Sequence, residues 1–210
     1  MRQLAVLLTT IVATVAMADD RPTIQIAVIP NYQSPALASR LTINPDGTVV
    51  REQSAIPVDI VNVEEMRGIS WVPEPKHPTD RISDNRRRLL WNQLEGVGLE
   101  TLANEYSAEF AYDVPGQVAQ VRTESGDTYT VPAKTERIVT HSATYQIHIH
   151  SAELSVDSSI YAPLAALEWE DPPHPDRQQI LKFVSAWYFI LRTSGPIAGW
   201  KAKCFRPYVQ

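Results

Sequence analysis

Residues 41–50 read LTINPDGTVV, two runs of strand-forming residues joined by a short turn. Apolar and β-branched residues on both sides of the turn favour extended backbone. Pro45 sets the φ angle that a type I turn requires, and Gly47 can adopt the left-handed conformation that lets the two strands pair again. The segment therefore predicts a β-hairpin and, around it, an antiparallel sheet.

Short apolar or alternating segments elsewhere extend the predicted sheet. Strands are expected at 24–29, 58–63, 69–72, 137–140 and 145–156. A second hairpin is expected where 117–123 and 128–131 flank the turn Glu124-Ser125-Gly126-Asp127.

Helical periodicity begins after residue 83. Apolar residues recur at three- and four-residue spacing from Leu90 to Phe110, which predicts two helices that meet at 96–98. Ser83 can cap the first helix with its hydroxyl, and Asp84 suits the positive end of the helix dipole. The run of basic residues 86–88 is interpreted as a solvated helix face, with an anion site as the alternative.

The C-terminal region predicts a further helix, which is strongly amphipathic. Asp176 is expected as its N-cap, Gln179 can complete a capping box, and Gly195-Pro196 ends the helix. The apolar face is expected to lie in the core, although a partner-binding face is the alternative. It consists of Ile180, Phe183, Val184, Trp187, Tyr188 and Leu191.

These patterns predict an α+β fold, in which a mostly antiparallel sheet packs against two or three helices, including the amphipathic C-terminal helix. The proline-rich segments 72–78 and 171–175 separate β, α, β and α stretches. Residues 19–210 are expected to form a single α+β domain, and 73–80 is where a sub-boundary would fall.

Residues 1–18 have the pattern of a signal peptide. Arg2 precedes an apolar stretch at 4–15, and Ala16-Met17-Ala18 has the small-x-small form of a cleavage site. An uncleaved anchor is the alternative, but a spanning helix needs about 20 apolar residues and this stretch is shorter. We therefore expect a periplasmic or secreted protein, most simply of the bacterial envelope, with no transmembrane segment after cleavage.

Charge and cysteine content limit the partners. The chain has 19 basic and 24 acidic residues, and its net charge of −5 disfavours nucleic acid as a partner. Cys204 is the only cysteine, so no disulfide can form within the chain. It is interpreted as a buried apolar residue, with pairing to another chain as the alternative. A protein or another envelope component is the expected partner.

One cluster has the residue types of a metal site. In a strand, His148 and His150 lie on one face roughly 6.6 Å apart, because each residue rises about 3.3 Å. Glu153, or His141 from a neighbouring strand, could supply a third ligand. Pairing Ile138 with Ile147 would instead place Arg137 opposite His148, where its charge would disfavour a cation. The histidines are therefore expected to be solvated strand residues.

The sequence lacks the usual catalytic motifs. It has no Gly-x-Ser-x-Gly turn, no His-Glu-x-x-His helix and no glycine-rich phosphate loop. The leading hypothesis is a non-enzymatic binding or scaffolding protein without a cofactor. The alternative is a metal-dependent hydrolase that holds a divalent metal such as zinc at the His-x-His motif.

Overall fold

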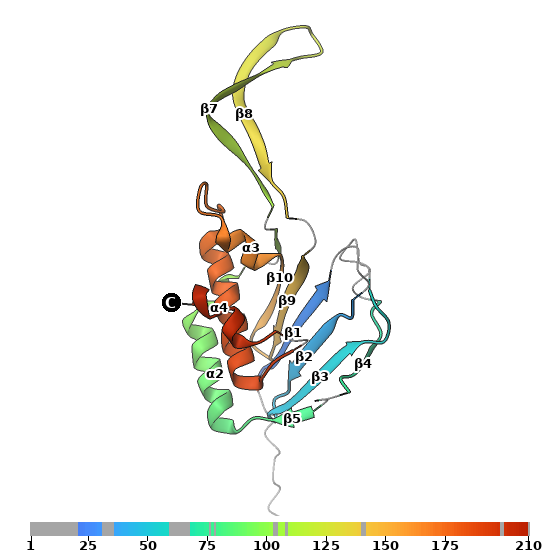
Figure 1. Cartoon of the computed structure of the whole chain (residues 1–210). Coiled ribbons are helices and arrows are strands. Elements are labelled where there is room, and N and C mark those ends of the chain that lie inside the picture. The colour runs from blue at the N-terminus through green and yellow to red at the C-terminus, as the bar shows by residue number, and fades with distance from the viewer. Residues whose placement is uncertain are drawn as a thin grey trace, which may run out of the picture.

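A computed structural model gives the fold of the chain (Figure 1). It describes residues 21–30, 36–58, 68–75, 77, 79–102, 105–107, 109–139, 142–197 and 200–209. The predicted signal peptide, His141 and nearly all of the strand predicted at 58–63 lie outside these residues.

An eight-stranded sheet forms the body of the protein, in the order β4-β3-β2-β1-β9-β10-β6, with β5 paired to β3. Neighbouring strands are antiparallel except β10 and β6, which are parallel. The strands are β1 (Thr23–Pro30), β2 (Ser39–Ile43), β3 (Thr48–Ser54), β4 (Trp71–Pro73), β5 (Thr79–Arg81), β6 (Glu105–Ser107), β9 (Ala143–His150) and β10 (Ser155–Tyr161).

The helices lie together on one face of this sheet (Figure 1). They are α2 (Asp84–Gly96), α3 (Pro163–Glu168) and α4 (Arg177–Ser194), with the 3₁₀ turns η1 (Leu99–Thr101), η2 (Ala202–Cys204) and η3 (Arg206–Tyr208). The predicted α+β class is confirmed. Among the described helices, none has the length and apolar content that crossing a membrane requires.

The hairpin of β2 and β3 forms as its turn residues predict. Gly47 has a φ of 86°, and its N–H donates to the carbonyl of Asn44 over 2.9 Å. The Asp46 carboxylate accepts from the N–H and the hydroxyl of Thr48. These hydrogen bonds, led by the backbone N–H of Thr48, lower the pKa of Asp46.

The core lies between the sheet and α4. Phe183 and Trp187 of α4 are fully buried, and the ring of Tyr145 from β9 meets Trp187 edge to face with centroids 5.2 Å apart. The prediction that the apolar face of α4 is core is confirmed, although Tyr188 is only partly buried. Cys204 is also partly buried and packs against this core.

The prediction of a second helix before Phe110 is wrong. Gly98 takes a left-handed conformation with φ 73°, and the 3₁₀ turn η1 follows it. The chain then enters β6, which pairs in parallel with β10. This pairing across the fold overrides the local helical periodicity, as tertiary contacts often do.

The prediction of a single strand over 145–156 is also wrong, because the chain turns at 151–154. The N–H of Ser151 donates to the carbonyl of Leu154 over 2.8 Å, and its hydroxyl accepts from the N–H of Leu154 over 3.0 Å. The turn makes β9 and β10 antiparallel neighbours. Ile147 pairs with Ile26 and Ser158, so the expected pairing of Ile147 with Ile138 does not occur.

The starts of α2 and α4 agree only in part with the sequence interpretation. Ser83 does cap α2, because its hydroxyl accepts from the N–H of Arg86 over 3.4 Å. Arg87, predicted as part of a solvated face, is buried with 6% exposure, while its two basic neighbours are exposed. At α4 no capping box forms, since Asp176 makes no capping hydrogen bond with its side chain.

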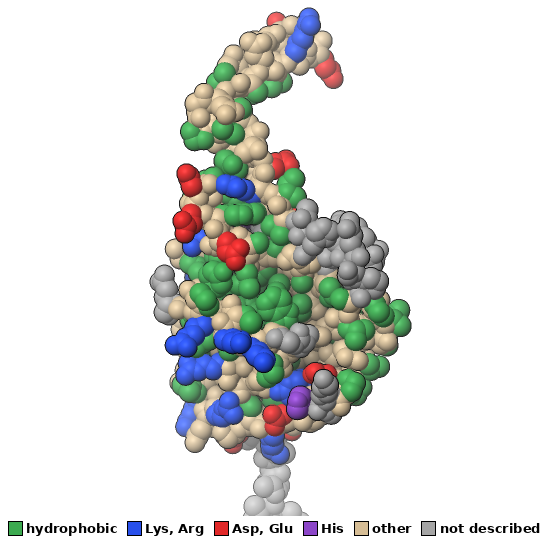
Figure 2. Space-filling model, viewed as in Figure 1, with side chains coloured by type: hydrophobic (Ala, Val, Ile, Leu, Met, Phe, Trp, Pro, Cys, Tyr) green, Lys and Arg blue, Asp and Glu red, His purple; other side chains and the backbone are tan. Residues whose placement is uncertain are grey.

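Strands β7 (Phe110–Arg122) and β8 (Thr128–Arg137) form a separate two-stranded sheet, here called the arm, which projects from the body (Figure 1, Figure 2). The second predicted hairpin is confirmed and is longer than expected. Its base is held to the body: the Phe110 ring lies 4.9 Å from that of His174, and Arg137 donates to the carbonyl of Asp171 over 2.7 Å.

Candidate metal centre

The candidate site lies on the sheet face opposite the helices. Side chains of β9 alternate, so that Tyr145, Ile147 and Ile149 are buried in the core while His148 and His150 point the other way. The two imidazole rings are nearly parallel, at 12°, with centroids 6.5 Å apart. This separation agrees with the spacing expected for a strand.

Asp157 of β10 completes the cluster. It lies directly opposite His148 in the antiparallel register. Its Oδ1 is 2.6 Å from Nδ1 of His148 and 3.4 Å from Nε2 of His150. One potential ligand atom from each of the three residues lies within 4.8 Å of the others. The cluster thus brings together two imidazoles and one carboxylate.

Ser155 orients the second histidine. It lies opposite His150 in the register, and its hydroxyl oxygen is 3.0 Å from Nδ1 of His150. When the serine accepts a hydrogen bond from this nitrogen, Nε2 of His150 presents a lone pair toward the carboxylate of Asp157. A cation between these two electron-rich atoms would stabilise the arrangement, and such supporting hydrogen bonds are usual around metal-binding histidines.

One distance in the cluster is close to that of a tetrahedral site. Ligand atoms bound at about 2.0–2.1 Å in a tetrahedron lie about 3.3 Å apart, and His150 and Asp157 are separated by 3.4 Å. The pair formed by His148 and Asp157 is at hydrogen-bond distance, so holding an ion requires a small side-chain rotation. The side chains of Asp157 and His150 are 55% and 53% exposed and have room to rotate.

The other residues predicted for the site lie elsewhere or outside the described chain. Glu153 is in the turn after β9, where it lines a cavity beside α2, and it is not part of the cluster. His141 is outside the described residues. Asp157 was missed because a continuous strand through 156 would have carried it away from His148.

Arg137 does not oppose His148, contrary to the sequence interpretation. It lies at the base of the arm, over the rings of Tyr112 and Trp169. The neighbours of His148 across the sheet are Gln25 of β1 and Asp157 of β10. The expected cationic neighbour is thus replaced by an anionic one, which changes the electrostatics in favour of a bound cation.

No protein-family model and no curated protein matches the chain. The interpretation of the cluster therefore depends on its geometry and on the chemistry of its side chains.

Proposed function

We propose that the protein is a non-enzymatic metal-binding protein of the bacterial envelope or the extracellular space. In this proposal His148, His150 and Asp157 hold one divalent transition-metal ion such as zinc. The observation that carries it is the convergence of three ligand atoms from neighbouring strands within 4.8 Å. The location depends on the signal-peptide pattern of residues 1–18.

The donor set supports this class of metal. Imidazole nitrogens suit zinc, copper, nickel and iron, whereas magnesium and calcium prefer shells of oxygen ligands. Three protein ligands leave at least one position for water or for a group from a partner. Because ligating histidines must be neutral, binding should weaken as the pH falls and protons compete with the metal.

Exposure supports binding rather than catalysis. More than half of the His150 and Asp157 side chains is open to solvent. The cavity beside α2 is lined by other residues. Metalloenzymes generally enclose the metal in a shaped cavity that excludes bulk water. The alternative is a metal-dependent hydrolase, in which the open position would hold a metal-bound hydroxide.

The proposal is tested by titrating chelator-treated protein with zinc in a calorimeter. We expect about one equivalent to bind per chain, and His148→Ala, His150→Ala and Asp157→Ala each to weaken binding by about tenfold or more, as loss of one ligand would do. Glu153→Ala is the matched control, because this exposed carboxylate lies outside the cluster. Absence of stoichiometric zinc, or equal loss in the control, would contradict the proposal.

The hydrolase alternative has its own measurement. Zinc-loaded protein is incubated with p-nitrophenyl acetate and with bis(p-nitrophenyl) phosphate. We expect no turnover above that of the zinc-free protein. Turnover that requires zinc and disappears in His148→Ala would favour the enzyme over the non-enzymatic protein.

A further inference from the structure

A cavity of about 520 Å³ lies between α2 and the end of the sheet where β1 begins and β2 ends. It is separate from the histidine cluster. Its walls come from the start of β1, the end of β2, one side of α2 and the turn between β9 and β10. This volume is typical of sites for small organic molecules, which are about 300–1,000 Å³. The proposed metal site contributes no residue to it.

One wall of the cavity is apolar. Ile24 of β1 and Ile43 of β2 are buried core residues that also line the cavity. Trp91 of α2 and Leu154 of the turn after β9 line it as well and are partly buried. These side chains can contact the apolar body of a ligand.

A buried guanidinium also lines the cavity, one turn of α2 before Trp91. The side chain of Arg87 is only 7% exposed, and its Nη2 forms an ion pair with Asp84. Within the described part of the chain, its Nε and Nη1 are buried without a hydrogen-bond partner. Burying a cation with most of its donors unpaired is costly. Because Arg87 lines the cavity, an anionic group there would offset this charge through space.

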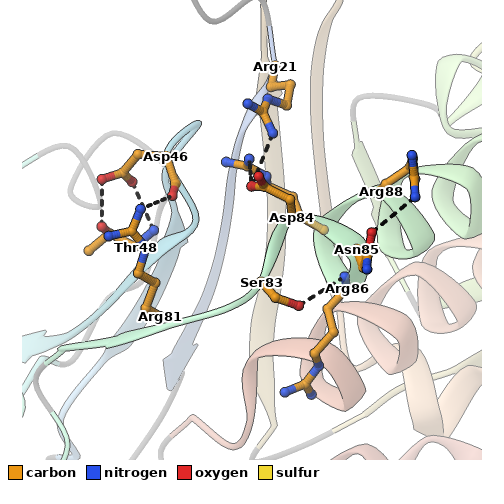
Figure 3. Close-up of polar contacts among 10 residues, drawn as sticks. Arg21, Asp46, Thr48, Arg81, Ser83, Asp84, Asn85, Arg86 and Arg88 are labelled. Carbon is orange, nitrogen blue, oxygen red and sulfur yellow. Dashed lines mark hydrogen bonds and ion pairs between the residues drawn. The ribbon is translucent and has the colours of Figure 1, made fainter.

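The single carboxylate of Asp84 does not balance the two charges of Arg21 and Arg87. Its carboxylate is 79% exposed and also pairs with Arg21 over 3.3 Å, as Figure 3 shows. Arg88 lines the cavity beside them and is exposed. Arg21 and Arg87 thus share one carboxylate where α2 begins, while Arg88 donates to Oδ1 of Asn85. The helix dipole adds positive potential there.

Besides Asp84, two other acidic residues line the cavity. Glu95 is three turns further along α2, and Glu153 is in the turn after β9. Their negative charges would repel an anionic group from those positions and leave the arginine end as its place. The cavity therefore has an apolar wall, basic residues where α2 begins, and Glu95 near the other end of α2.

We propose that this cavity binds a small amphipathic organic anion. The apolar body of the ligand contacts Ile24, Ile43 and Trp91. Its carboxylate or phosphate group lies at the arginine end, near Arg87 and Arg88. This inference is independent of the proposed metal site.

The test uses 8-anilino-1-naphthalenesulfonate as a fluorescent probe and decanoate as its competitor. We expect the probe to bind saturably and decanoate to displace it. Decanol should bind about tenfold more weakly than decanoate, because it lacks the negative charge. Arg87→Met and Arg88→Gln should each weaken decanoate binding by about tenfold. Arg86→Gln is the control, since Arg86 is on the same helix turn but contacts the carbonyl of Thr193 instead.

A further measurement separates loss of binding from loss of folding. Denaturation midpoints identify any variant that fails to fold; if Arg87→Met does, Arg88→Gln and Trp91→Ala decide the question. Equal displacement by decanol and decanoate, or unchanged decanoate binding in these variants, would overturn the proposal.

Sedimentation with phosphatidylglycerol and phosphatidylcholine vesicles distinguishes a free ligand from a lipid headgroup. Arginine-dependent decanoate binding without sedimentation indicates a free amphipathic anion. Arginine-dependent sedimentation with phosphatidylglycerol alone indicates the same chemistry on a lipid. If the protein neither binds decanoate nor sediments with the vesicles, the inference is overturned.

Discussion

Gly47 and Ile82 meet backbone to backbone. The N–H of Ile82 donates to the carbonyl of Gly47 over 3.0 Å, and a Cβ atom on Gly47 would lie 2.6 Å from the carbonyl oxygen of Ile82. This contact joins the turn between β2 and β3 to the segment that leads into α2. The hairpin therefore also fixes where the first helix begins.

Replacing Gly47 with alanine should destabilise the protein by about 1–3 kcal/mol, since the new Cβ clashes and the residue has a positive φ. Gly96→Ala is the matched control. Apart from its chain neighbours and the backbone of its own helix, no atom of the described residues lies within 4 Å of a Cβ at that position. Alanine in a helix gains about 0.4–1 kcal/mol over glycine. Urea denaturation should move the two midpoints in opposite directions, and a shift in the same direction would contradict this account.

Trp187→Ala should lower the free energy of unfolding by roughly 3–5 kcal/mol, because it removes a fully buried side chain from the core. Leu89→Ala on α2 is the comparison, since Leu89 is 58% exposed and surface changes usually stay within about 0.5 kcal/mol. Guanidinium denaturation measures both. Similar small effects in the two variants would mean that α4 does not form the core.

The elements predicted correctly are those with local causes. Pro45 and Gly47 determine the hairpin turn within four residues, and the apolar spacing of α4 holds over its whole length. Ser83 is likewise recognisable as a cap from its position before the helix. These features need no knowledge of the rest of the chain.

The features that sequence reasoning missed depend on contacts across the fold. The turn at 151–154 has no glycine or proline to mark it, so Asp157 could not be placed opposite His148. Segment 99–110 has helical spacing, yet β6 pairs with β10. The histidine pair was thus predictable from strand periodicity, whereas its acidic partner required the topology.

Alkaline pH should destabilise the protein through Tyr145. Burial, and secondarily the nearby Cys204, raise the pKa of its hydroxyl well above the usual value. The folded state keeps this proton at pH values where the unfolded chain loses it, so stability falls as the pH rises above about 10, by at most about 1.4 kcal/mol per unit. The stabilising contribution is fully present below the unfolded pKa.

The measurement is denaturant unfolding between pH 8 and pH 11, values chosen to span the ordinary tyrosine pKa of about 10. Tyr145→Phe should reduce the loss of stability at high pH. Tyr129→Phe, on the arm with 57% exposure, is the control. If both variants follow the parent protein, burial of Tyr145 does not control the alkaline response.

The arm should contribute little to the stability of the body. Val118, Val121 and Tyr129 of its outer half are 69%, 49% and 57% exposed, and a two-stranded sheet alone is only marginally stable. Its described anchors to the body, including Phe110 and Arg137, lie at its base. The outer half therefore has little apolar contact to hold it.

Two measurements follow from this arrangement. Replacing 114–133 with a two-residue Asn-Gly turn should change the free energy of unfolding of the body by no more than about 0.5 kcal/mol, because the anchoring contacts remain. In the intact protein, amides of the outer half should exchange hydrogen for deuterium faster than those of β9, which is paired on both sides. Phe110→Ala is the contrasting variant, since it removes ring contacts with Trp169 and His174 and should destabilise the protein more. A large loss of stability on shortening, or strong protection of the outer amides, would mean that the arm is stabilised by contacts beyond its base.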